Sequence, residues 1–295
     1  MALFAVYFFW GTTYLGIRMA LEAVPPVALI GMRFILSGGA LLIAAKIIGA
    51  KLPEGRELGL TALYGLIALG GGNGTLVFSE QWIPSGIAAL FVTTSPFWMV
   101  GIEALRNHGE KLTKATVVGI AIGFLGILVL IGPSATGAGL GPTLIKSFLL
   151  LQLGCFCWCL GSILQKSQPT KAHPVVSGAI QQLATGLTIL PFTLVANENP
   201  VQWHHRGIWA VAYLVVFGSI IGYSAFIYAM AHLPVSVVST YAYVNPIVAV
   251  FLGWLFYREP FGTRELLAMA LVISGVIIVK YFAYATPKVR EASIS

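Results

Sequence analysis

The sequence predicts an all-α polytopic membrane protein, with ten transmembrane helices arranged as two inverted five-helix repeats around a central cavity. Hydrophobic residues make up 58% of the 295 residues and charged residues only 9%. A soluble domain carries roughly 25% charged residues, so lipid must be the outer solvent here. Residues 1–131 also align with residues 144–284 at an offset of 148 to 150 residues, so the chain contains a duplicated unit.

The duplication is carried by landmark residues that recur in the same order in both halves. Membrane-embedded repeats are typical of transporters in which two units surround a central substrate site. The aligned pairs are Trp10 with Trp158, Pro26 with Pro174, Pro84 with Pro234, Ser95-Pro96 with Asn245-Pro246, Glu110 with Glu259, and Gly126 with Gly275.

The first repeat, residues 1–131, supplies five spans. Its first apolar stretch begins at residue 2, with no basic segment before it and no small-residue cleavage site after it. We therefore interpret it as a span rather than a signal peptide. Prolines mark the connections. The predicted spans are residues 2–20, 27–49, 58–79, 84–105 and 113–131, each about 20 residues, the length that crosses a bilayer.

The second repeat, residues 144–284, follows a Gly-rich linker at residues 132–143 and precedes a tail at residues 285–295. Prolines mark its connections as well. Its predicted spans are residues 144–165, 174–195, 208–231, 235–256 and 264–284.

Lys and Arg predict the orientation of these spans. With the N-terminus inside, the cytoplasmic segments hold eleven of these residues and the outer segments five, so both termini are predicted to be cytoplasmic. Because five spans is an odd number, the second repeat must enter the membrane from the opposite face. The two repeats are then antiparallel copies, which can expose a shared centre to either side in turn.

The residues that carry the repeat also carry a family resemblance. Residues 9–18 (FWGTTYLGIR) resemble the opening helix of EamA-type repeats. Residues 84–113, with a Pro, an Ala/Gly-rich helix, Ser95-Pro96 and a closing Gly-Glu-x-Leu-Thr, resemble the family's next landmark, and residues 234–263 repeat it. The resemblance covers nearly the whole chain and indicates the drug/metabolite transporter superfamily. It implies a cavity surrounded by helices 1–4 and 6–9, with helices 5 and 10 at the edge.

The abundance of aromatic residues looks most like the YddG-like aromatic amino-acid exporters of bacterial inner membranes. This resemblance implies a multi-pass protein of the bacterial inner membrane that exports small amphipathic metabolites, including aromatic amino acids.

Two glycine-rich stretches occupy matching places in the repeats, residues 70–74 (GGGNG) and 218–224 (GSIIGYS). Such interrupted spans point to a midplane site where freed backbone groups meet a polar ligand, and Asn73 is the polar candidate there. Tight helix packing explains the same glycines, since both stretches contain GxxxG.

Aromatic side chains are candidates for the cavity wall, because an amphipathic solute needs flat apolar faces and a few polar contacts. Interfacial belts and core filling are the alternative roles. Gln181, a buried amide, either binds solute or bonds a neighbouring helix. The full set of candidate substrate contacts is Trp10, Tyr14, Asn73, Trp98, Trp158, Gln181, Tyr223, Tyr228, Tyr241 and Tyr243.

Arg33 is the most deeply placed ionisable residue, and a charge on a membrane helix is a functional hypothesis. It either binds a substrate carboxylate or forms a structural or gating ion pair with Glu80. No carboxylate stands at the centre of a predicted span, so we expect a facilitator or exchanger without an internal proton relay. The candidate gate hinges are Pro84, Pro96, Pro234 and Pro246.

Other functions fit less well. A multidrug or lipophilic-cation exporter is the alternative, although it would be expected to carry a membrane carboxylate. An intramembrane protease would need HExxH, paired membrane aspartates or a Ser-His dyad. The sequence contains no HExxH and no Asp, and all five His fall in predicted loops or at span ends. A channel stays as a further alternative. We expect no cofactor, no metal site at the three clustered cysteines and no nucleic-acid partner. The expected partners are a small-molecule substrate and lipid; the sequence leaves the oligomeric state open, and a monomer is compatible with it.

Overall fold

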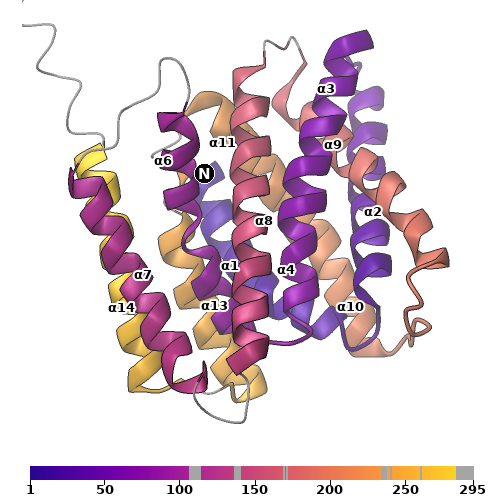
Figure 1. The fold of residues 1–295 in the computed structure, drawn as a ribbon. Coiled ribbons are helices and arrows are strands. Elements are labelled where there is room, and N and C mark those ends of the chain that lie inside the picture. The colour runs from indigo at the N-terminus through magenta and orange to yellow at the C-terminus, as the bar shows by residue number, and fades with distance from the viewer. Residues whose placement is uncertain are drawn as a thin grey trace, which may run out of the picture.

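The computed structural model describes residues 1–105, 114–135, 141–168, 170, 172–233, 238–239, 241–259 and 261–283. Within these residues the chain forms helices joined by short turns, and no strand occurs among them. Figure 1 shows a bundle of long helices with the paired α7 (Lys114–Ala135) and α14 (Thr263–Ala283) at one edge. The predicted all-helical membrane fold is therefore confirmed.

The helices of the first half follow the predicted spans with one difference. The span predicted at residues 84–105 is two helices rather than one, broken at Thr93-Thr94. Pro96 lacks the N–H that would bond the Val92 carbonyl, which weakens the α-helix at this point. Besides α7, the helices are α1 (Ala2–Ala20), α2 (Pro26–Ile47), α3 (Gly55–Gly65), η1 (Leu66–Asn73), α4 (Gly74–Ser79), α5 (Ser85–Val92) and α6 (Ser95–Ala104).

The second half repeats this pattern. Besides α14, its described helices are α8 (Gly141–Ser167), α9 (Pro174–Ile189), η2 (Leu190–Leu194), α10 (His205–Tyr213), η3 (Leu214–Tyr223), α11 (Ser224–His232) and α13 (Tyr241–Tyr257). In the described parts of both halves together, five continuous helical segments are long and apolar enough to cross a membrane, and shorter apolar helices lie at Val117–Val129 and Val244–Tyr257.

Both glycine-rich stretches widen into π-helix. The segment η1 lies within the span Gly55–Ser79, and η3 lies within the span His205–His232. Glycine tolerates the altered backbone, and π turns are rare outside functional sites. The matching placement of the two π segments is thus a local consequence of matching glycines.

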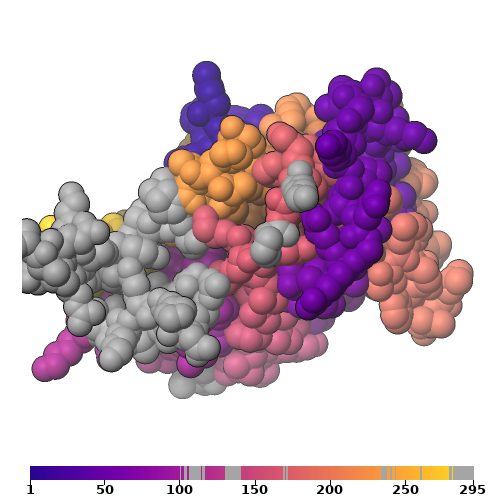
Figure 2. Space-filling view, turned by 90° about the horizontal axis from the view of Figure 1, so that it is seen from above, coloured from indigo at the N-terminus to yellow at the C-terminus, as the bar shows by residue number. Residues whose placement is uncertain are grey.

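Helices of the two halves pack against each other in a pattern that stays the same when the halves are exchanged. Helix α2 packs on α9, and α7 packs on α14. Helix α1 packs on η3 and α13, just as α8 packs on η1 and on α5 and α6. From above, segments of both halves lie side by side across the bundle (Figure 2).

Repeat-related glycines explain how α7 and α14 approach so closely. A Cβ on Gly126 would lie 2.8 Å from the Ala268 carbonyl oxygen, and one on Gly275 would lie 2.4 Å from the Gly119 carbonyl oxygen. Only glycine allows these backbones to meet, as in other membrane helix pairs. On the outside of the bundle, large apolar side chains such as Phe4, Leu149 and Trp254 are exposed, which suits a lipid-facing surface.

Candidate functional site

A cavity lies at the centre of the bundle, between α1, α2, η1, α8, η3 and α13. Its volume is about 80 Å³, which is room for roughly six water molecules. Typical ligand pockets measure roughly 300–1,000 Å³, so a larger solute requires the helices to move apart. The described lining is Trp10, Thr13, Tyr14, Arg33, Phe34, Leu69, Gly72, Asn73, Leu76, Val92, Ser95, Leu151, Gly154, Cys155, Trp158, Gly218, Ser219, Tyr223, Tyr241 and Asn245.

Aromatic rings form one wall of this cavity. The repeat-related Trp10 and Trp158 meet edge to face, with centroids 5.3 Å apart, and Phe226 lies within 4.9 Å of the first and 5.2 Å of the second. Tyr241 and Tyr223 extend the cluster, 5.3 Å from Trp10 and 6.1 Å from Trp158. Edge-to-face packing presents ring faces and ring edges to the space between them, so the wall can accept another aromatic ring.

Glycines of the π segments allow these bulky side chains to come so close. A Cβ on Gly72 would lie 2.9 Å from the Trp158 Cβ, and one on Gly222 would lie 2.7 Å from the Trp10 Nε1. The Trp10 indole N–H donates to the Gly218 carbonyl at 3.2 Å. The glycines therefore serve close packing and the cavity at once, and the two interpretations of the glycine-rich stretches do not compete.

Arg33 is the charged group in the cavity. Its side chain is 5% exposed, and it joins the π segments of the two halves. Its Nε donates to Ser219 Oγ at 2.7 Å, and its Nη1 donates to Asn73 Oδ1 at 3.5 Å. A Cβ on Gly218 would lie 2.9 Å from Nη2, so glycine makes room for the guanidinium.

No ion pair joins Arg33 to Glu80 in this conformation, although the sequence analysis offered such a pair as one role for Arg33. Among the described residues, no carboxylate lies within ion-pairing distance of the guanidinium, whose described partners are uncharged. Glu80 itself is fully buried, and its two carboxylate oxygens accept no hydrogen bond from the described part of the chain.

The structure brings six of the predicted substrate contacts together at the cavity and leaves three away from it. Trp98 donates to Gln152 at 2.9 Å, and Gln181 accepts from the Tyr223 hydroxyl at 2.6 Å behind the wall. Tyr228 is half exposed and stacks on His232. The six that line the cavity are Trp10, Tyr14, Asn73, Trp158, Tyr223 and Tyr241.

The remaining candidates have varied positions. Pro84 precedes α5, Pro96 is the second residue of α6, and Pro246 lies inside α13. Pro234 and the side chain of Tyr243 lie outside the described residues.

Several residues at the cavity were not singled out from sequence. The hydroxyl groups of Thr13, Ser95 and Ser219 line it, and Phe226 fills the aromatic wall. Two of them carried a sequence signal, because Ser219 lies within the glycine-rich stretch 218–224 and Ser95 belongs to the repeat landmark Ser95-Pro96. In the described ranges no group of three His, Cys, Asp or Glu side chains could hold a metal ion.

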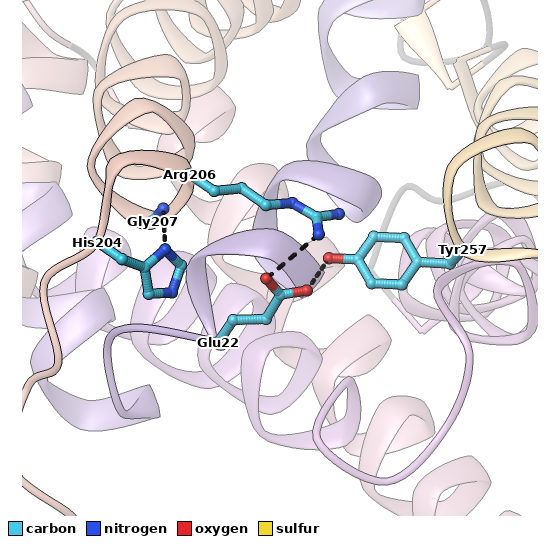
Figure 3. A network of polar contacts seen from close by, with 5 residues as sticks. All are labelled: Glu22, His204, Arg206, Gly207 and Tyr257. Carbon is cyan, nitrogen blue, oxygen red and sulfur yellow. Dashed lines mark hydrogen bonds and ion pairs between the residues drawn. The ribbon is translucent and has the colours of Figure 1, made fainter.

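Charged contacts tie together one end of the bundle, formed by the last turns of α1 and α13 and the first turns of α2, α5 and α10; we call it the Glu22 end. Glu22 lies 3.6 Å from Arg206 and accepts a hydrogen bond from the Tyr257 hydroxyl, while Arg206 covers the Tyr257 ring at 4.9 Å (Figure 3). His204 caps α10 by accepting from Gly207 N at 3.1 Å (Figure 3).

Glu259 makes a second set of contacts between the halves at the same end. Its carboxylate accepts from Ser85 N at 2.9 Å, from Ser85 Oγ at 3.0 Å and from Gly86 N at 3.1 Å. These donors are the first turn of α5, where the helix dipole also favours a negative charge. Hydrogen bonds that cross between the two halves therefore hold the helices together at the Glu22 end.

Comparison with known proteins places this architecture in a family. The model of the EamA-like transporter family matches residues 1–132 and 145–281. The chain is 37% identical over 289 residues to the uncharacterized inner membrane transporter YedA of Escherichia coli (strain K12), covering 97% of this chain and 92% of that protein. It is 24% identical to an uncharacterized transporter of Archaeoglobus fulgidus, covering 92% of this chain and 94% of the relative. A solved crystal structure shares the fold with a TM-score of 0.71 at 22% identity, over 96% of each chain.

Proposed function

Because the chain belongs to the EamA-like transporter family of the drug/metabolite transporter superfamily, and so is a membrane transporter of small molecules, we propose that it exports small amphipathic carboxylates by alternating access. Amino acids with aromatic side chains are the proposed principal substrates, as in the YddG-like exporters it resembles. One observation carries this proposal: a buried guanidinium, with no carboxylate partner among the described residues, lines the same cavity as several aromatic side chains.

A buried arginine favours an anionic ligand. Removing a cation from water is costly unless an anion and hydrogen bonds compensate. Ser219 and Asn73 supply neutral acceptors for Arg33, and neither supplies charge. A solute carboxylate would provide both the charge and the planar pair of oxygens that a guanidinium binds best.

The aromatic wall favours a ring on the same solute. Trp10 and Trp158 stand beside Arg33 in the cavity lining, and the Trp158 indole N–H has no acceptor among the described residues. A solute with a carboxylate and an aromatic side chain would satisfy both features. A lipophilic cation would instead face the positive charge of Arg33, the only charged side chain in the described lining.

Transport requires the cavity to widen, because its present volume of about 80 Å³ is too small for such a solute. We propose that two inverted repeats, residues 1–131 and 144–284, joined by the linker 132–143, exchange conformations to open either end. The break at Thr93-Thr94, beside Pro96, is the hinge proposed for the first repeat.

The proposed location is the inner membrane of a bacterium, with both termini and the tail at residues 285–295 in the cytoplasm. In this topology the Glu22 end faces outside. A reporter fused after residue 200 tests the arrangement, since that position follows the seventh span and is expected outside. A cytoplasmic signal from this fusion contradicts the inverted repeat.

Substrate counterflow in proteoliposomes tests the function. We expect labelled tryptophan to exchange, and we expect tryptamine, which lacks the carboxylate, and a quaternary amine to exchange poorly. Arg33→Gln should abolish this preference for tryptophan over tryptamine, whereas Lys51→Gln, which removes an exposed charge outside the cavity, should keep it. Equal exchange of tryptophan and tryptamine by the unmodified protein contradicts carboxylate recognition.

A further inference from the structure

Glu80 lies one helical turn beyond the cavity, towards the Glu22 end. It follows α4 directly, after the last residue of the span Gly55–Ser79. Asn73 and Leu76, which line the cavity, precede it by seven and four residues, the spacing that places side chains on one helix face. The residue therefore borders the route between the cavity and the Glu22 end.

The Glu80 carboxyl group has no donor from the protein to stabilise a negative charge. It is 0% exposed, and neither oxygen accepts a hydrogen bond from the described residues. Glu259, at the same end, provides the contrast, because it accepts from two backbone N–H groups and one hydroxyl. Hydrogen bonds thus stabilise an ionised carboxylate at Glu259, whereas the described residues donate none to the Glu80 carboxyl group.

The two arginines near Glu80 donate hydrogen bonds to groups other than its carboxyl group. Arg18 on α1 donates to the backbone carbonyl of Glu80 at 2.6 Å rather than to its carboxyl group. Arg33 on α2 donates to Ser219 and Asn73.

The other titratable groups facing this region also leave the Glu80 carboxyl group unpaired. Tyr14 on α1 and Glu259 after α13 are close enough to interact with it electrostatically. Lys146 on α8 lies over the Trp82 ring at 3.8 Å. None of these groups, nor either arginine, forms an ion pair with Glu80 among the described residues.

We propose that Glu80 is a proton-binding site that holds a proton while the Glu22 end is closed and releases it when that end opens. A dry carboxylate without donors is unfavourable, so the closed form keeps the neutral acid. On opening, water reaches the residue, the O–H bond breaks, and the proton passes to water. The carboxylate that remains is then hydrated and lies beside Arg18.

This site gives the transporter a pH-dependent gate. The closed form binds one more proton than the open form, so lowering the pH favours closure and raising it favours opening. The sequence placed Glu80 at the outer end of a span and no carboxylate at the centre of any span, so it predicted no internal proton relay. Burial of the side chain changes that expectation.

Hydrogen exchange measured by mass spectrometry, without any solute, tests the proposal separately from substrate identity. The purified full-length chain in lipid nanodiscs is compared from about pH 6 to about pH 9, with rates divided by those of the unfolded chain at each pH. For the unmodified protein, we expect the corrected exchange of residues 19–25, 80–86 and 254–259 to rise together, by up to about tenfold per pH unit.

Three variants make the result specific. Glu80→Gln should remove the pH slope in all three segments, and Glu80→Asp should retain it because the carboxyl group is kept. Glu259→Gln should weaken protection of the same segments at every pH while leaving the slope. Corrected exchange that does not change with pH in the unmodified protein overturns the proposal, and so does a pH slope that survives Glu80→Gln. A slope confined to residues 80–86 overturns it as well, because it would indicate local fraying. If Glu80→Gln does not fold, Glu80→Asp decides the test. Loss of the pH slope in this variant also overturns the proposal.

Discussion

Gly218→Ala tests whether the π-helical glycine exists to make room for Arg33. The added Cβ would lie 2.9 Å from Arg33 Nη2 and 2.9 Å from Thr13 Cγ2. Carbon contacts settle at about 3.5–4.0 Å, so the neighbours must move by roughly 0.6–1.1 Å. The guanidinium is the flexible end of a long side chain, and its bond to Asn73 is already 3.5 Å long. We therefore expect the arginine to shift and to lose this contact.

Gly218→Ala should change both the stability of the protein and its affinity for the substrate, and the two effects can be estimated separately. Overpacking costs about 1–3 kcal/mol, and the better helix propensity of alanine returns about 1 kcal/mol, so the net loss of stability is at most about 2 kcal/mol. A weakened hydrogen bond between a guanidinium and a solute carboxylate costs about 1.5–3 kcal/mol, which is roughly a 10- to 100-fold loss of affinity. The KM for tryptophan counterflow should rise accordingly.

The assay pairs tryptophan counterflow with thermal unfolding in detergent. Gly39→Ala is the matched control, because a Cβ at Gly39 meets nothing within 4 Å. It should leave KM unchanged and raise the unfolding temperature slightly. If Gly218→Ala transports tryptophan with the KM of the unmodified protein, the proposed role of Arg33 in carboxylate binding is refuted.

Three further substitutions probe the site and its frame. Trp158→Ala should raise the KM for tryptophan. Trp98→Ala should leave it unchanged, because Trp98 donates a hydrogen bond to Gln152 and is not part of the described cavity lining. Equal effects of the two substitutions on KM would contradict a role for Trp158 in the site. Gly275→Ala should lower the unfolding midpoint by the equivalent of about 1–3 kcal/mol, whereas Gly101→Ala, which meets nothing within 4 Å, should be neutral. Glu259→Ala should lower the stability of the protein by about 1–2 kcal/mol, because α5 loses the carboxylate that accepts from Ser85 N and Gly86 N. An unchanged unfolding midpoint would contradict this capping role.

The fold follows from sequence because lipid imposes simple constraints. Each span must be apolar and about 20 residues long, and the glycines at 126 and 275 recur because two backbones meet there. The glycine-rich stretches likewise indicated where the spans are interrupted, and both became π-helix. These features are local properties of the chain.

The orientation of individual side chains could not be predicted in the same way. In a membrane helix the lipid face is as apolar as the buried face, so hydrophobic periodicity does not identify the interior. Trp98 and Trp158 both lie in apolar runs, yet only Trp158, which the repeat pairs with Trp10, is part of the described cavity lining. Tyr228 proved half exposed, and the break at Thr93-Thr94 depends on how one proline acts within an apolar run.

The site itself shows why duplication matters for a transporter. Arg33 comes from the first half and bonds Ser219 from the second, while Trp10 of the first half meets Trp158 of the second and donates to the Gly218 carbonyl. These contacts cross between the halves, and the glycines that permit them, Gly72, Gly218 and Gly222, lie in the two π segments. In the alternating access that we propose, opening either end would disturb these cavity contacts and the contacts at the Glu22 end together.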